Sequence, residues 1–94
     1  MTQVHDLKCW PESFAAIGQE RKTLELRKND RDFQVGDYLL LREYEPGPNA
    51  RYTGATTLAS VTHILREGDA FGELLAAKDV VAMSIYVLDE QDAS

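Results

Sequence analysis

Residues 18–27 read GQERKTLELR, in which a glycine and a basic turn lead into an alternating segment. Thr23, Glu25 and Arg27 share one face of an extended chain, because side chains two positions apart lie on the same side. The intervening leucines take the other face, and this period of two predicts a half-buried strand over Thr23–Lys28. The charged face is therefore either a solvated edge or the polar wall of a binding cleft.

A short helix is predicted just before this strand. Trp10, Phe14 and Ile17 recur at spacings of four and three residues, which places them on one apolar helical face that we expect to contact the core. Pro11 suits the first turn of a helix and Gly18 suits its end.

The rest of the chain indicates a small α+β fold. Glu45–Gly54 contains two prolines and two glycines, and this composition predicts a long hairpin loop. Five strands with one small helix are too many for a flat open sheet, so we predict a mixed β-barrel that closes its edges, with the helix plugging one end. The other predicted strands are Val4–Lys8, Tyr38–Tyr44, about ten residues within 55–65, and Val80–Asp89.

Length and composition indicate one domain. The chain has 94 residues, of which 44% are apolar and 28% charged, as in soluble globular proteins. We expect a single domain over residues 3–89 and a frayed tail over 90–94, with Phe71, Leu74 and Leu75 capping the core from a loop or a helical turn. No secretory signal or membrane span is recognised, so the predicted location is the cytoplasm.

The net charge of −6 arises entirely in the second half of the chain. Residues 1–42 carry seven basic and seven acidic side chains, whereas residues 43–94 carry three and nine. A protein that coats duplex nucleic acid needs a broad basic surface to release counterions. Only a local basic patch lies between Arg21 and Arg31, so binding to extended duplex DNA is excluded, and an anionic ligand would be small or held at one point.

Histidine and cysteine residues do not predict a metal or a cofactor. His5 and His63 lie on predicted strands, and together with Cys9 they lack the spacing of a ligand set. The single cysteine cannot form an internal disulfide, and we expect it to be a small buried side chain and not a nucleophile. Asp37 follows Gly36 in a predicted turn and needs no further role.

Three longer stretches suggest a family. Residues 5–44 (HDLKCWPESFAAIGQERKTLELRKNDRDFQVGDYLLLREY), YTG at 52–54 and AMSIYVL at 82–88 resemble the ASCH domain, a branch of the PUA-like superfamily. The resemblance is closest to small stand-alone bacterial and phage members of unassigned function, and its most specific part is Gly18, Lys22, Glu25 and Arg27.

The resemblance implies a PUA-like barrel with a cleft beside the helix, lined by Lys22, Glu25 and Arg27, with RNA or a nucleotide base as ligand. Some ASCH members are hydrolases that remove an acyl group from the exocyclic amine of a modified cytidine. Those enzymes have a threonine nucleophile at the position of Glu25. They also use a glutamate from the region of the fourth strand, whereas residues 46–66 of this chain contain no acidic residue.

The same residues support this function on chemical grounds. A carboxylate at Glu25 beside the guanidinium of Arg27 presents acceptors next to donors, which is what reading a base edge requires. Lys22 adds a point charge for a phosphate. Alternatively, the group is a surface ion pair, worth ~0–1 kcal/mol and without function.

Three further residues are candidates for the same site. Arg31 and Lys8 would extend its positive rim. Tyr52 lies in a Pro/Gly-rich segment that exposes it, so it would either stack on a base or fold back as a lid.

We therefore carry three hypotheses for the function. The first is a binding module for RNA or a modified nucleoside. In this hypothesis Lys22, Glu25 and Arg27, which we call the charged trio, face one cleft that binds a flat polar heterocycle. The second is an amidohydrolase acting on an acylated cytidine, with Glu25 as general base and Lys22 as electrostatic partner. The third is a protein-interaction module that uses the acidic second half.

Overall fold

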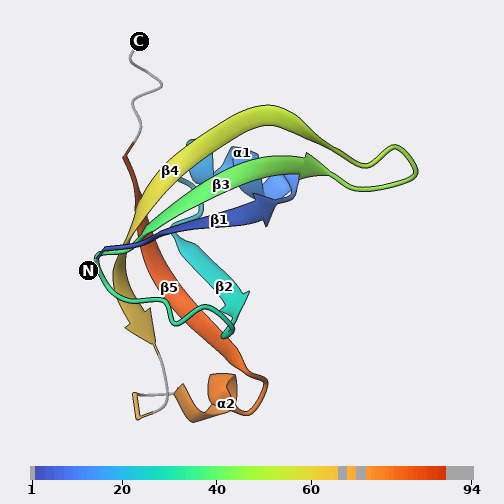
Figure 1. Cartoon of the computed structure of the whole chain (residues 1–94). Coiled ribbons are helices and arrows are strands. Elements are labelled where there is room, and N and C mark those ends of the chain that lie inside the picture. The colour runs from blue at the N-terminus through green and yellow to red at the C-terminus, as the bar shows by residue number, and fades with distance from the viewer. Residues whose placement is uncertain (1, 66–67, 70–71, 89–94) are drawn as a thin grey trace.

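Five strands form one sheet that curls into a half-barrel, with a short helix between the first two strands (Figure 1). The computed structural model describes residues 2–65, 68–69 and 72–88. The predicted mixed barrel-like α+β fold and its order of one strand, one helix and four strands are confirmed, and one further helical turn precedes the last strand. The elements are β1 (Val4–Cys9), α1 (Pro11–Gly18), β2 (Leu24–Lys28), β3 (Tyr38–Glu45), β4 (Arg51–Leu65), α2 (Gly72–Ala76) and β5 (Val80–Val87).

The strand order is β1-β3-β4-β5-β2, which leaves β1 and β2 as the two edges of the sheet. β1 pairs with β3 in parallel, and the other three pairs are antiparallel. No hydrogen-bonded ladder joins β1 to β2 within the described part of the chain. The barrel therefore remains open along one line, so the prediction that it closes its edges is wrong. The polar backbone groups of the two edge strands must find other partners there.

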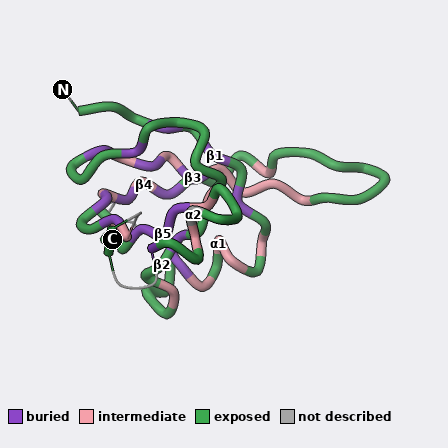
Figure 2. The backbone as a smooth tube through the Cα atoms, turned by 90° about the horizontal axis from the view of Figure 1, so that it is seen from below, coloured by how far each residue is buried: buried purple, intermediate pink, exposed green. Residues whose placement is uncertain are grey.

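The core fills the inner face of the curled sheet. In β1 every second side chain is buried, so His5, Leu7 and Cys9 point inward. Buried positions run along the strands, while the hairpin between β3 and β4 is mostly exposed (Figure 2). The apolar core comprises Leu7, Cys9, Ile17, Phe33, Leu39, Leu41, Ala59, Val61, Ile64, Val81, Met83 and Ile85.

The helix α1 packs on the core through two of the three predicted residues. Ile17 is fully buried, and Phe14 is partly buried against the core. The prediction for Trp10 is wrong, since its side chain is 62% exposed. Trp10 is the residue before the first helical turn and has an extended backbone, so it does not continue the helical face that the spacing suggested.

Strand β2 buries its charged face and exposes its leucines. Leu24 and Leu26 are 47% and 55% exposed, whereas Glu25 is only 4% exposed. The register with β5 explains this orientation, because Glu25 lies opposite the fully buried Met83 and directly paired residues project to the same face of a sheet. The expectation that the charged face points inward therefore holds for Glu25.

The hairpin between β3 and β4 is longer and more regular than predicted. The expected loop over 45–54 is wrong, because β3 continues to Glu45 and β4 begins at Arg51. The turn takes only residues 46–50, which include both prolines of the predicted loop. A register shift between Arg42 and Tyr44, together with a positive φ at Gly54, lets the strands continue past an irregularity. The hairpin projects away from the half-barrel (Figure 1).

The segment before β5 contributes little to the described core. Leu74 in α2 is exposed and Leu75 is half-buried, so the predicted cap is at most partial at these two residues. Phe71 and the predicted tail at residues 90–94 lie outside the described residues.

Asp37 is buried and connects three segments, a role that the sequence analysis missed. Its carboxylate lies 2.8 Å from the ring of His5 and accepts hydrogen bonds from the backbone N–H groups of Gln3 and Gln34, at 3.2 and 3.0 Å. Burial alone would raise the pKa of this carboxyl, but the hydrogen bonds outweigh it, and the pKa lies below its ordinary value of 3.8. Asp37 therefore stabilises the folded state in its ionised form.

We expect Asp37→Asn to lower the free energy of unfolding at pH 7 by about 2–3 kcal/mol, since hydrogen bonds to a charged acceptor are lost. Because the folded pKa is depressed, this stabilisation is complete well above pH 3.8 and disappears as the pH falls through the folded pKa. Urea unfolding of wild type and variant between pH 7 and pH 2.5 should show the difference narrowing in acid. Asp30→Asn, at an exposed carboxyl, is the control. A difference that stays constant over the whole range would contradict the assignment.

Candidate ligand site at the seam between β1 and β2

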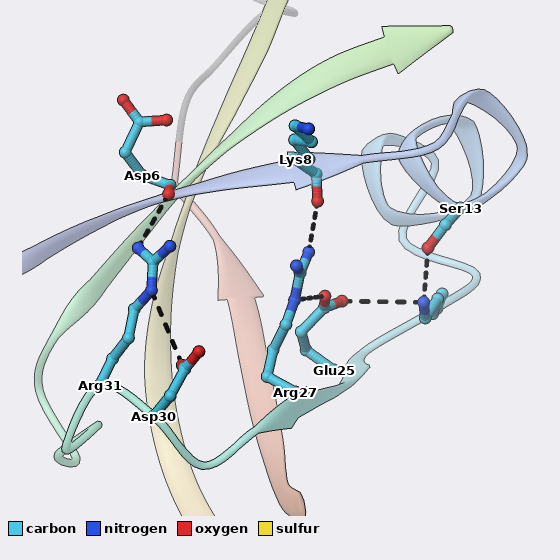
Figure 3. Close-up of polar contacts among 8 residues, drawn as sticks. Asp6, Lys8, Ser13, Glu25, Arg27, Asp30 and Arg31 are labelled. Carbon is cyan, nitrogen blue, oxygen red and sulfur yellow. Dashed lines mark hydrogen bonds and ion pairs between the residues drawn. The ribbon is translucent and has the colours of Figure 1, made fainter. Parts of the chain in front are cut away.

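Two arginines bridge the open line of the barrel, which we call the seam. Arg27 Nη2 donates to the carbonyl oxygen of Lys8 at 2.6 Å, and Arg31 Nη1 donates to the carbonyl oxygen of Asp6 at 3.0 Å (Figure 3). Carbonyls of alternate residues leave a strand on the same side, so both guanidinium groups reach the same free edge of β1. Side chains thus take the place of a backbone ladder at the seam.

Glu25 holds Arg27 from inside the barrel. Its Oε2 accepts from Arg27 Nε at 2.6 Å, and its side chain is only 5% exposed. A buried carboxylate needs a close cation to offset its lost hydration, and Arg27 meets that need. The other oxygen, Oε1, is buried without a hydrogen bond among the described residues, and the ammonium group of Lys22 lies 3.7 Å away.

Lys22 reaches this carboxylate from the turn after α1. The turn is fixed by the N–H groups of Arg21 and Lys22, which both donate to the carbonyl of Ala16. Lys22 Nζ donates to Ser13 Oγ on α1 at 2.5 Å (Figure 3). The ammonium group therefore lies between a hydroxyl and a carboxylate, while the side chain remains 38% exposed and can move on its flexible stem.

Cys9 is buried close to Ser13 and Glu25. Burial raises the pKa of its thiol, and the negative charge of Glu25 raises it further. A hydrogen bond with Ser13 and the charges of Arg27 and Lys22 act in the opposite direction without cancelling the increase. The thiol is thus less acidic than a free cysteine and, as the sequence suggested, is unsuited to be a nucleophile.

A cleft of about 120 Å³ opens at the seam beside Arg27. Its volume is that of roughly four water molecules, so it can take one small ring or an anionic group. The buried side chains of Leu7 and Phe33 provide an apolar surface, and the polar residues offer donors together with one carboxylate. The lining consists of Leu7, Arg27, Lys28, Asp30, Arg31 and Phe33.

Four of the six predicted ligand-binding residues lie at the seam: Lys22, Glu25, Arg27 and Arg31. Of these four, only Arg27 and Arg31 line the cleft, so the prediction that Lys22 and Glu25 line it too is wrong for this cleft. The side chains of Lys8 and Tyr52 lie apart from them. Lys8 belongs to the exposed set of β1, with its ammonium group 4.4 Å from the ring centre of Tyr44, and Tyr52 also packs against Tyr44. Lys8 therefore does not extend the positive rim as predicted, and Tyr52 does not line the cleft, either as a stacking surface or as a lid.

Ser13, Leu7 and Phe33 were missed as members of the site. Leu7 carries the alternating pattern of β1, which identifies it as inward-facing but not as part of a cleft. Ser13 lies in the first turn of α1, and nothing in the sequence marks it as a partner of Lys22. Phe33 lies outside the regular elements, where no periodicity predicts its orientation.

Neither a metal site nor a membrane span is found in the described chain. Among residues 2–65, 68–69 and 72–88, no group of three His, Cys, Asp or Glu side chains is arranged to hold a metal ion. None of the helices described is long and apolar enough to cross a membrane.

Comparison with known proteins assigns this chain to a family. A family profile described as a domain of unknown function, DUF3850, matches residues 4–85. The chain belongs to the DUF3850 family. The matched range begins with β1 and extends into β5, so all of the seam residues lie inside the DUF3850 domain.

A phage protein is similar to this DUF3850 chain. The uncharacterized 12.9 kDa protein in the GpA 3′ region of Escherichia phage P2 is 31% identical over 64 residues. The aligned segment covers 68% of this chain and 56% of the phage protein, so the chain spans little more than half the length of that relative.

We expect Arg27→Met to destabilise the fold by about 3–5 kcal/mol, because it leaves the Glu25 carboxylate buried without its close cation. The double variant Glu25→Leu/Arg27→Met should recover most of that loss, because both charges are then removed together. Urea unfolding at pH 7 measures both values. Arg51→Met is the matched control, since Arg51 pairs with Glu45 on the exposed hairpin and should change stability by at most about 1 kcal/mol. If the double variant loses as much stability as Arg27→Met, the unpaired Glu25 carboxylate is not the cause of that loss.

Proposed function

We propose that the seam binds a nucleobase, presented either by a nucleoside or by an unpaired nucleotide of RNA. The observation that carries this proposal is the fixed position of Arg27 at the wall of the cleft. Glu25 and the carbonyl of Lys8 each hold its guanidinium at 2.6 Å, so little side-chain entropy is lost when its remaining N–H groups meet a ligand.

The cleft offers the contacts that a flat polar ring needs. Leu7 and Phe33 supply apolar contact for a ring, while Arg27 and Arg31 supply donors for carbonyl oxygens. The carboxylate of Asp30 supplies an acceptor for an amine. This combination of an apolar surface with a few fixed polar groups is typical of small-molecule sites, and a cleft of about 120 Å³ leaves the sugar and phosphate outside.

Lys22 and Glu25 do not line the cleft itself, but they lie next to Arg27 and would provide a second set of contacts. The gap of 3.7 Å between Lys22 Nζ and Glu25 Oε1 is too long for a hydrogen bond. A donor such as an exocyclic amine would satisfy this buried oxygen once Lys22 turns outward. The displaced ammonium group would then be free to contact a phosphate.

We also propose that the half-barrel belongs to the ASCH branch of the PUA-like superfamily. The five-stranded mixed sheet, the helix between its first two strands, and the clustering of Lys22, Glu25 and Arg27 after that helix support this relationship. The relationship makes RNA or a nucleotide base the expected ligand.

We expect wild type to bind nucleosides in a calorimetric titration against cytidine, uridine, adenosine and guanosine. Arg31→Met and Glu25→Gln should lower the affinity for the best-binding nucleoside roughly 10- to 100-fold, the range expected for lost charge-assisted hydrogen bonds. Arg51→Met and Glu45→Gln are matched controls on the hairpin and should bind like wild type. Melting curves of each variant separate lost binding from lost folding. Absence of binding by all four nucleosides would overturn the proposal for free nucleosides, and unchanged affinity in Arg31→Met would place the ligand elsewhere.

A hydrolase acting on an acylated cytidine is the second candidate function. The observation that favours it is the contact of 2.5 Å between Ser13 Oγ and Lys22 Nζ, since a serine beside a lysine serves as nucleophile and base in some hydrolases. Lys22 donates in this contact, so it would have to lose a proton before it could act as the base. Ser13 would then supply the hydroxyl that the Glu25 position lacks. Glu25 itself is a poor candidate for the base, because Arg27 occupies one of its oxygens.

For this candidate we expect wild type to release acetate and cytidine from N4-acetylcytidine, and Ser13→Ala to abolish that release. Chromatographic separation of cytidine from its acetylated form measures the turnover. Ser84→Ala, at an exposed position on β5, is the control. If wild type binds the acetylated nucleoside without turnover, the module is a binder and not an enzyme.

A further inference from the structure

Two tyrosines and two cations form a continuous patch on the outer face of β1, β3 and β4. Lys8 Nζ lies 4.4 Å from the ring centre of Tyr44, and Arg42 Cζ lies 4.8 Å from the ring centre of Tyr52. The two rings are 5.0 Å apart and inclined at 67°. We call these four residues the tyrosine–cation patch.

The patch is both accessible and fixed in place. Tyr44 and Tyr52 are directly paired across β3 and β4, and Tyr52 is 43% exposed. Arg42 is also held by Asp6 at 3.5 Å. Rings that are already oriented lose little conformational freedom on binding, which makes aromatic side chains effective contacts on a surface.

Electrostatics at the patch favour stacking over phosphate binding. The cations Arg42 and Arg51 are paired with Asp6 and Glu45, whereas Lys8 makes no ion pair with any described residue. At most one charge here is thus available for a phosphate. Exposed rings and a planar guanidinium group can stack on unpaired bases, since every base offers an aromatic face, and this contact needs few free charges.

The patch adjoins the seam through β1. The carbonyl of Lys8 faces the seam, where it accepts from Arg27, while the side chain of the same residue lies over Tyr44 on the outer face. The edge strand β1 therefore has the seam on one side and the patch on the other at this residue. A chain with one base in the cleft could cross β1 and place a neighbouring base on the patch.

We propose that the tyrosine–cation patch stacks unpaired bases of a single-stranded RNA whose adjoining base occupies the seam. The ligand of the protein is then a short unpaired stretch, and the patch contributes affinity without reading the base edge. This inference rests on the proposed function for the path of the RNA from the seam across β1, but base stacking on the patch can be tested separately.

The test compares the nucleosides uridine, cytidine and adenosine with fluorescein-labelled tetramers rU4, rC4 and rA4. Calorimetry gives the nucleoside affinities, and fluorescence anisotropy gives those of the tetramers. The best tetramer should bind at least about tenfold tighter than its nucleoside, and Tyr52→Leu should weaken the tetramer roughly 5- to 100-fold, the range for one lost stacking contact. Nucleoside affinity should not change in Tyr52→Leu, and Tyr52→Phe should keep the wild-type tetramer affinity because stacking needs only the ring.

Tyr86→Leu is the matched control. Tyr86 is 63% exposed on β5 and is paired with Ser60, which lies eight residues along β4 from Tyr52, or roughly 26 Å in an extended strand. The variant should bind tetramers like wild type. Tetramer affinity should also depend weakly on salt, with a slope of log K against log salt no steeper than about −2, since each phosphate contact contributes roughly −0.7.

The outcomes separate this inference from the proposed function. If nucleosides bind and the tetramer binds no more tightly than its nucleoside, the patch is not a stacking surface. The same conclusion follows if Tyr52→Leu binds the tetramer with wild-type affinity and has an unchanged melting temperature. If the tetramer binds through Tyr52 while no nucleoside binds and Arg31→Met has no effect, the patch is supported and the seam proposal is overturned. A loss in Tyr52→Leu that Tyr52→Phe shares to the same extent would also contradict stacking.

Discussion

The ion pair between Glu25 and Arg27 is the interaction on which the rest of this structure depends. A carboxylate on the inner face of a small barrel is costly unless a cation accompanies it, and Arg27 meets this need from the same strand, two residues away. The guanidinium also reaches the carbonyl of Lys8, so the group that neutralises Glu25 is the group that connects the two edge strands. Closure of the half-barrel and construction of the candidate site are therefore one feature of the molecule.

This arrangement explains the unusual orientation of β2. A strand with two leucines and a glutamate would ordinarily bury the leucines, but pairing with β5 turns Glu25 inward and leaves Leu24 and Leu26 exposed. The chain thus gives up apolar burial at two positions to keep a charged side chain inside. Such a local conflict between sequence pattern and structure is expected at functional sites.

The sequence identifies the elements well and the environments of individual side chains less well. The helix over 11–18 and the five strands follow from periodicity, and the grouping of Lys22, Glu25 and Arg27 follows from spacing and from a family resemblance. Periodicity reports which residues share a face but not which face is buried. For β2 that depended on the register with β5, in which Glu25 pairs with Met83, 58 residues further along the chain. Trp10 was misplaced because a spacing of four does not show where a helix begins. Asp37 was missed because its partners, His5 and the amide of Gln3, are distant in sequence.

The way in which the half-barrel is bridged also determines what sets the size of its opening. A backbone ladder fixes neighbouring strands about 4.8 Å apart whatever the side chains are, whereas a contact made by arginine stems has a span set by the residue at that position. The width of the mouth between β1 and β2 therefore depends on the side chains of Arg27 and Arg31 and not on a backbone ladder between these two strands. A substitution at either arginine would therefore change the size of this opening while the pairing of the five-stranded sheet stays the same.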